Sequence, residues 1–102
     1  MITHVVLLRI RKAASKTEIE RVFAELAALR TRIPGLLSFS GGAYSSPEGL
    51  HKGFTHGFVM TFADAAARDA YLPHPEHEKV KKLVLAVLDG GLDGVVAFDY
   101  AS

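Results

Sequence analysis

The fold is decided by the opening stretch of the chain, Ile2-Thr3-His4-Val5-Val6-Leu7-Leu8-Arg9-Ile10-Arg11. Side chains alternate between the two faces of a strand, and one face here carries an almost wholly apolar set: Ile2, His4, Val6, Leu8 and Ile10. Val5 and Leu7 make the middle of the opposite face apolar as well. Helices can cover one face of a sheet, so a strand that is apolar on both faces predicts a second covering layer. Another subunit would supply that layer, which indicates a dimer.

The length and composition are typical of one globular domain covering residues 1–102. The 102 residues are 49% hydrophobic and 23% charged, and a chain of this size buries roughly two thirds of its unfolded surface. The net charge of +1 gives no electrostatic reason to expect a nucleic acid or an anionic membrane as partner. The absence of cysteine excludes disulfides and thiolate chemistry. With no membrane-spanning run and no secretion signal, we expect a cytoplasmic protein.

A first helix is indicated by Ser15 and Glu18, which have the spacing of a capping box. In such a box each side chain bonds to a backbone N–H that is left free at the start of the helix. Ile33-Pro34-Gly35 ends this helix, because proline disfavours helical geometry in the residue before it.

A second helical region is predicted after residue 64, in two pieces. Asp64 is a cap for a short helix that Pro73 ends. Pro75 suits the first turn of a second piece, and Gly90-Gly91 supplies its C-terminal stop.

Three further strands are predicted at residues 36–44, 54–62 and 95–100. In the first of them, Leu37 and Phe39 fall on one face, and the glycines allow a bulge or a close approach. The resulting order of strand, helix, strand, strand, helix, strand predicts a ferredoxin-like β-α-β-β-α-β fold of the α+β class. Its four-stranded antiparallel sheet would carry helices on one face and pair with a second subunit through the other.

Acid/base chemistry is concentrated in one segment, Tyr71-Leu72-Pro73-His74-Pro75-Glu76-His77. Imidazole changes charge near neutral pH, and a nearby phenol can donate or accept a proton. A structural explanation competes with this one: His74 and Pro75 start a helix, His77 lies in its first turn and Tyr71 is a half-buried aromatic. A zinc site generally needs three or four protein ligands, and no third candidate joins His74 and His77, so we expect no metal.

Five segments together resemble the stress-responsive α/β-barrel (Dabb) family: His4-Val5-Val6-Leu7, Ile33-Pro34-Gly35, Gly53-Phe54-Thr55-His56, the Tyr71 to His77 motif, and Phe98-Asp99-Tyr100. The resemblance runs along the whole chain and implies a homodimer of ferredoxin-like subunits, the dimeric α/β barrel. Plant polyketide cyclases of this family close a ring by an intramolecular aldol reaction, whereas many relatives have no established activity. In those cyclases the acid/base pair is the tyrosine and the last histidine of Y-x-x-H-P-x-H, which match Tyr71 and His77. Such acid/base chemistry in this chain would require no metal or organic cofactor.

The resemblance also implies a pocket with histidines from the first and third strands, which correspond to His4 and His56. We expect a ligand to contact a set of histidines and apolar side chains: His4, His56, His74, Phe58 and Met60. Antiparallel pairing of the first and third strands would place His4 and His56 toward opposite ends, and a core role explains His56 equally well.

The chain departs from the family pattern in two places. Phe54 stands where relatives often carry tyrosine, a change that removes a hydroxyl and keeps the ring. Asp89-Gly90-Gly91-Leu92-Asp93-Gly94 is glycine-rich and either alters a pocket wall or lengthens a loop.

Two functions follow. The first is a small homodimeric stress-responsive barrel protein that binds an apolar carbonyl-bearing molecule, with cyclase-like or isomerase-like acid/base activity. His77 would abstract a proton next to the carbonyl, and Tyr71 would hydrogen-bond the developing enolate. The second is a non-catalytic dimeric structural or stress-response module, in which the same residues hold the helix start.

Overall fold

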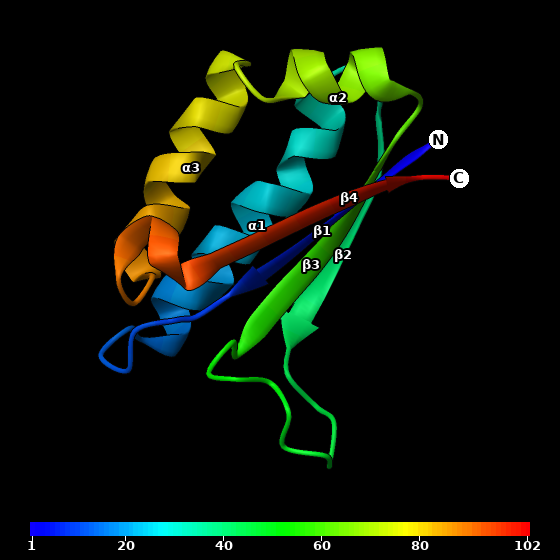
Figure 1. Cartoon of the computed structure of the whole chain (residues 1–102). Helices are drawn as coiled ribbons and strands as arrows, with labels where there is room; N and C mark the ends of the chain where they lie inside the picture. The colour runs from blue at the N-terminus through cyan, green and yellow to red at the C-terminus, as the bar shows by residue number, and fades with distance from the viewer.

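The computed structural model describes residues 1–102 as four strands, three α-helices and a short 3-10 turn (Figure 1). In chain order the elements are β1 (Ile2–Leu8), α1 (Lys16–Arg32), β2 (Leu36–Ala43), β3 (His56–Phe62), α2 (Ala65–Tyr71), α3 (Pro75–Val87), the 3-10 turn Gly91–Gly94 and β4 (Val95–Ala101). The second helical region is in two pieces, as Pro73 predicts. The β-α-β-β-α-β order predicted from the sequence is confirmed.

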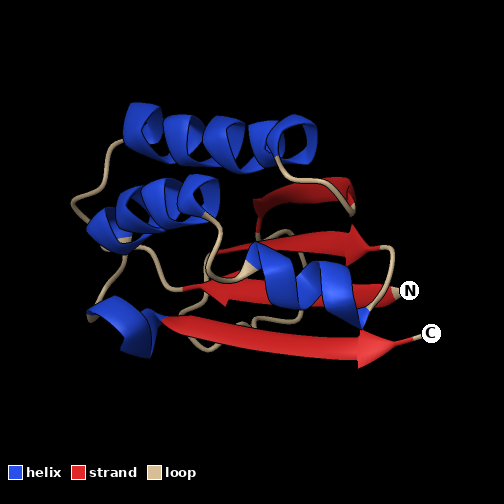
Figure 2. Cartoon of the chain, turned by 90° about the horizontal axis from the view of Figure 1, so that it is seen from above, coloured by secondary structure: helices blue, strands red, loops and turns tan.

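The strands form one antiparallel sheet in the order β2-β3-β1-β4. The helices lie on one face of this sheet. Figure 2 shows this arrangement from above, with helices in blue and strands in red. β1 and β3 are therefore central, and β2 and β4 are the edges. This is the predicted ferredoxin-like topology.

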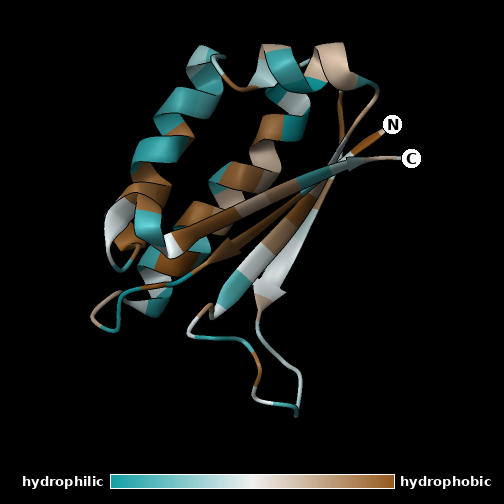
Figure 3. Cartoon of the chain, viewed as in Figure 1, coloured by the Kyte–Doolittle hydropathy of each residue, from teal (hydrophilic) through white to brown (hydrophobic).

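The two faces of β1 differ as the alternation predicts. Ile2, His4, Val6 and Leu8 are buried under the helices, whereas Leu7 is exposed. The pairing registers set Val5 beside Val59 and Phe98, and Leu7 beside Val96. We call the side of the sheet without helices the open face, and its large apolar side chains are Val5, Leu7, Val59, Val96, Phe98 and Tyr100. Much of β1 and β4 is coloured as hydrophobic in Figure 3.

The capping box at the start of α1 is present in both directions. The Ser15 hydroxyl accepts from the Glu18 N–H at 3.1 Å, and the Glu18 carboxylate accepts from the Ser15 N–H at 3.0 Å. Two backbone donors of the first turn are thereby satisfied, an effect that contributes about 1 kcal/mol to helix stability. Glu18 also pairs with Arg11 at 2.8 Å, which ties the helix start to the end of β1.

The prediction that Leu37 shares a face with Phe39 is wrong. The β2–β3 register shifts between Leu36 and Ser38, so Leu37 is the extra residue of a bulge and is 52% exposed. Phe39 instead shares the covered face with Leu36. The strand does approach its neighbours closely at Gly41, where a Cβ would lie 2.7 Å from the Cβ of Phe58.

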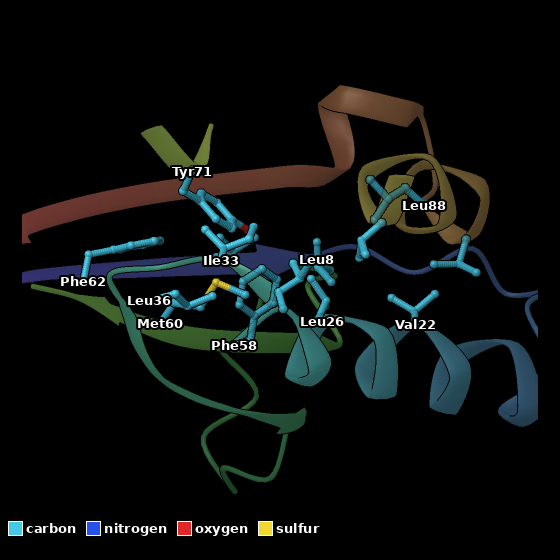
Figure 4. Packing of buried hydrophobic residues seen from close by; sticks show 14 of the residues in the cluster. Leu8, Val22, Leu26, Ile33, Leu36, Phe58, Met60, Phe62, Tyr71 and Leu88 are labelled. Atoms are coloured by element: carbon cyan, nitrogen blue, oxygen red, sulfur yellow. The ribbon is translucent and has the colours of Figure 1, made fainter. Parts of the chain in front are cut away.

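The core lies between the covered face of the sheet and the helices (Figure 4). Its largest fully buried side chains are Tyr71, Phe62, Leu8, Leu29, Met60 and Val80. Tyr71 packs in the core against Phe62, and the centroids of the two rings are 4.9 Å apart. None of the helices is both long and apolar enough to cross a membrane.

Candidate active site

A cavity of about 250 Å³ opens between the covered face of the sheet and α3. It exists because α1 packs on β2 and α3, while edge strand β4 contacts mainly β1 and the 3-10 turn. Its 14 lining residues, 11 of them hydrophobic, are His4, Val6, Leu8, Leu26, Phe58, Tyr71, Leu72, His77, Lys81, Val84, Leu85, Leu92, Val95 and Ala97. A cavity of about 150 Å³ holds benzene, so this one suits a ligand of one or two rings.

Tyr71, the last residue of α2, supplies a hydroxyl to this cavity. Its side chain is 1% exposed, yet its hydroxyl makes no hydrogen bond to the protein. Because no fully buried side-chain oxygen or nitrogen lacks a partner, the hydroxyl must reach the cavity surface. Burial raises the pKa of Tyr71 well above its usual value, so the phenol keeps its proton and acts as a hydrogen-bond donor.

His77 lies in the first turn of α3, with its ring 4.2 Å from that of Tyr71 between centroids. Its Nδ1 is 2.8 Å from the Leu72 carbonyl oxygen. A carbonyl only accepts hydrogen bonds, so Nδ1 carries the hydrogen and Nε2 holds the free lone pair. Burial lowers the pKa of His77, although the Leu72 carbonyl acts in the opposite direction. The imidazole is therefore neutral at neutral pH, and its Nε2 is a basic atom on a residue that lines the cavity.

His4 contributes a second imidazole, and its partners were not foreseen from the sequence. Its Nδ1 lies 2.5 Å from Asp99 Oδ1, and Arg68 donates to Asp99 Oδ2 at 2.9 Å. Burial alone would raise the pKa of Asp99, but the hydrogen bonds from His4 and Arg68 outweigh it and hold the pKa low. The ionised carboxylate fixes the Nδ1 hydrogen of His4, which leaves Nε2 without a protein partner. The β1–β4 register, which sets His4 opposite Asp99, brings this pair together.

The remaining residues expected to contact a ligand lie apart from the cavity, except Phe58, which lines it. His56 pairs with Leu8 at the far end of β1, so it is separated from His4 as antiparallel pairing predicts, and its ring packs on Phe23 at 5.8 Å. Met60 is fully buried in the core. His74 caps α3, where its Nδ1 accepts from the Glu76 N–H at 3.1 Å.

The glycine-rich segment before β4 forms one wall of the cavity. Leu92 lines the cavity and is 69% exposed. Arg9 holds this wall in place, because its side chain donates to the Asp93 carbonyl at 3.1 Å and its backbone bonds to Gly94 and Asp89 at 2.8 Å each. The segment thus contributes Leu92 to the pocket wall. No group of three or more His, Cys, Asp or Glu side chains is placed to hold a metal ion.

Comparison with known proteins identifies the family. The model of the stress-responsive A/B barrel domain, Dabb, matches residues 2–102. The chain belongs to the Dabb family. It is 33% identical to the stress-response A/B barrel domain-containing protein HS1 of Arabidopsis thaliana over 99 residues, which cover 97% of this chain and 87% of HS1.

Solved structures of other proteins share the fold of this Dabb protein. A dimeric ferredoxin-like protein of unknown function from Jannaschia aligns with a TM-score of 0.89 at 31% identity, covering 99% of this chain and 98% of the other. A hydroxynitrile lyase from Passiflora edulis aligns with a TM-score of 0.86 at 22% identity, covering 97% and 90% of the two chains. At the latter identity the likeness shows the fold alone.

Proposed function

We propose that this Dabb protein is a homodimer whose cavity binds an apolar carbonyl-bearing molecule and moves a proton on it, in a cyclase-like or isomerase-like reaction. One observation carries the proposal. Three polar groups without protein partners, the Tyr71 hydroxyl and the Nε2 atoms of His77 and His4, belong to residues lining one otherwise apolar cavity. A few convergent polar groups in an apolar pocket are typical of a small-molecule site.

The reaction would start with His77 as the base. Its Nε2 takes a proton from the carbon next to the carbonyl, and the resulting imidazolium keeps its Nδ1–H bond to the Leu72 carbonyl. The Tyr71 hydroxyl donates to the enolate oxygen as negative charge develops there. His77 then returns the proton, either to carbon in an isomerisation or to the alkoxide oxygen formed when the enolate attacks a second carbonyl. Every proton that leaves the substrate returns to it through His77, and nothing is oxidised or reduced, so no cofactor is required.

The homodimer is supported by the open face of the sheet. Phe98 is 63% exposed and Tyr100 49%, and both lie on β4 opposite the helices. Exposed apolar patches of this kind mark interaction surfaces, and the Jannaschia relative is dimeric. Pairing of two open faces would enclose these side chains.

A non-catalytic module is the second candidate, favoured by the local roles of the two motif histidines. His74 caps α3 through its Nδ1, and His77 bonds to the Leu72 carbonyl. Both bonds would stabilise the α2–α3 junction without any substrate. In that case replacing His77 would lower stability by about 1 kcal/mol and affect nothing else.

Proton exchange at the α-carbon of 2-tetralone, a bicyclic ketone, separates the two functions. Followed by proton NMR in D2O, exchange should be accelerated by the wild-type protein and lost in His77→Gln. Tyr71→Phe should slow it about 100-fold, the loss expected for one oxyanion donor. His51→Gln is the matched control, because His51 is a histidine outside the cavity lining. Exchange that persists in His77→Gln would exclude His77 as the base.

A further inference from the structure

Lys81 is the one permanently charged side chain in the cavity lining. The other polar groups of the lining are the Tyr71 hydroxyl and the imidazoles of His4 and His77, and no carboxylate lines the cavity. Asp99 lies behind His4, with both of its oxygens already bonded to His4 and Arg68. The one permanent charge in the cavity lining is therefore positive.

No carboxylate lies within ion-pair distance of Lys81, although the charge of Glu78 acts on the neighbouring His77 as well. Lys81 forms no ion pair, although Glu78 stands three residues before it on α3, and the nearby pair on that helix joins Lys79 to Glu76 at 3.6 Å. The residue is exposed, so its aliphatic stem contributes to the cavity wall while the ammonium stays hydrated at the mouth. A hydrated cation at a pocket mouth binds an anion without a large desolvation cost.

Lys81 also lies close to His77, the proposed base, on the same helix. Lys81 follows His77 by four residues, which places the two side chains on the same face of α3, roughly 6 Å apart at Cβ. Burial is the main cause of the lowered pKa of His77, and the charge of Lys81 adds to it. An anionic group bound by Lys81 would thus lie about one helical turn from the carbon whose proton His77 removes.

We propose that the ligand of this cavity carries a carboxylate, bound by Lys81 at the mouth, on an apolar body of one or two rings that reaches Tyr71 and His77. This assignment rests on the proposed function and adds the charge of the ligand to it. It makes Lys81 a specificity-determining residue.

The test compares 2-naphthoate with 2-naphthamide, which share a two-ring body and differ in charge. Isothermal titration calorimetry at neutral pH should show the acid binding about fivefold more tightly, the scale of one partly exposed ion pair. Lys81→Met keeps the stem and should abolish the preference by weakening the acid alone, whereas Lys81→Arg should retain it. Lys82→Met is the matched control, because Lys82 is the next residue on α3, exposed, and outside the lining. High salt should reduce the preference in the wild type.

Each other outcome overturns a stated part of the inference. Equal binding of the two probes, or a preference that survives in Lys81→Met, removes the role of Lys81 while leaving a pocket for neutral ligands. Failure of both probes to bind removes the ligand-binding cavity and the inference with it. An intact acid preference without tetralone exchange keeps the carboxylate site and removes catalysis, so the two proposals fail separately.

Discussion

Asp99 is the residue on which the geometry of the second imidazole depends, and Asp99→Asn tests this dependence without changing the shape of the side chain. Asparagine offers one acceptor oxygen and one donor NH2 group in place of two acceptor oxygens. Arg68 can only donate, so the amide oxygen must face Arg68 and the NH2 must face His4. Nδ1 of His4 must then accept, which moves its hydrogen to Nε2. The substitution therefore makes Nε2 of His4 a hydrogen-bond donor.

The structure sets the size of the accompanying loss of stability. Hydrogen bonds to charged groups contribute about 1.5–3 kcal/mol each when shielded. The side chains of Asp99 and Arg68 remain 23% and 24% exposed, so the lower end of this range applies. Both contacts persist with a neutral amide in place of the carboxylate, so each bond loses only the difference between a charged and a neutral acceptor, about 0.75 kcal/mol, or about 1.5 kcal/mol for the two bonds. For a domain of this size that loss lowers Tm by roughly 6–12 °C.

The loss should depend on pH in a defined direction. The folded-state pKa of Asp99 is lowered, so its contribution is fully present above the unfolded value of about 3.9 and is lost as pH falls through the folded value. The gap between wild type and Asp99→Asn should accordingly be full at neutral pH and shrink below about pH 4.

Urea unfolding at neutral pH and below about pH 4 would measure the loss of stability and its pH dependence. Nitrogen NMR of the histidine rings would show which nitrogen of His4 carries the hydrogen. Asp69→Asn is the matched control, because Asp69 pairs with the same Arg68 at 2.7 Å but its side chain is 67% exposed. Removing that exposed pair should cost less than about 0.5 kcal/mol. The reasoning is refuted if Asp99→Asn unfolds like Asp69→Asn, or if His4 keeps its hydrogen on Nδ1.

Three further perturbations test the fold, the titration of the site and the open face. Gly41→Ala should lower the free energy of unfolding in urea by about 1–3 kcal/mol, because its Cβ would lie within 3 Å of three atoms. Gly42→Ala is the control and should leave this free energy unchanged, because its Cβ would meet nothing within 4 Å. Equal effects of the two substitutions would contradict the close approach at Gly41. The pKa of His77 is lowered on folding, so wild-type stability should fall as pH drops below about 6.5, and a His77→Gln variant with an unchanged slope would disprove this. Phe98→Asp should give monomers in dilute sedimentation runs, unlike Ala27→Asp, which changes an exposed residue of α1 on the other side of the sheet. Dimeric Phe98→Asp would count against pairing through the open face.

The parts of the fold that the sequence predicts are those determined by local chemistry. Ser15 and Glu18 satisfy each other's backbone donors within one turn, and Asp64 accepts from the Ala67 N–H at 2.8 Å, so both helix starts are readable from a few residues. The bulge at Leu37 is different, because the small polar residues after it give weak alternation and the register is decided by pairing with β3. A pattern within one strand does not contain that information.

The candidate site likewise combines residues that are close in the sequence with residues that only the fold brings together. Tyr71 and His77 lie six positions apart in one segment, so their proximity follows from the helix break between them. His4 and Asp99 are separated by 95 positions, and only the pairing of the first and last strands brings them together. Lys81 belongs to the site because β4 leaves space beside α3, a matter of three-dimensional packing that composition does not reveal.

β4 links the cavity and the open face of the sheet through the alternation of its side chains. Val95 and Ala97 line the cavity and Asp99 holds His4, while Phe98 and Tyr100, between and beyond them, point to the open face. As an edge strand, β4 has backbone pairing on one side only, so its position depends on β1 and on what covers its apolar side chains. Burial of Phe98 and Tyr100 against a second subunit would fix the strand that carries Asp99. In such a dimer, subunit pairing and the orientation of His4 would be coupled through this single strand, and a substitution on the open face should disturb the cavity although it touches none of its lining.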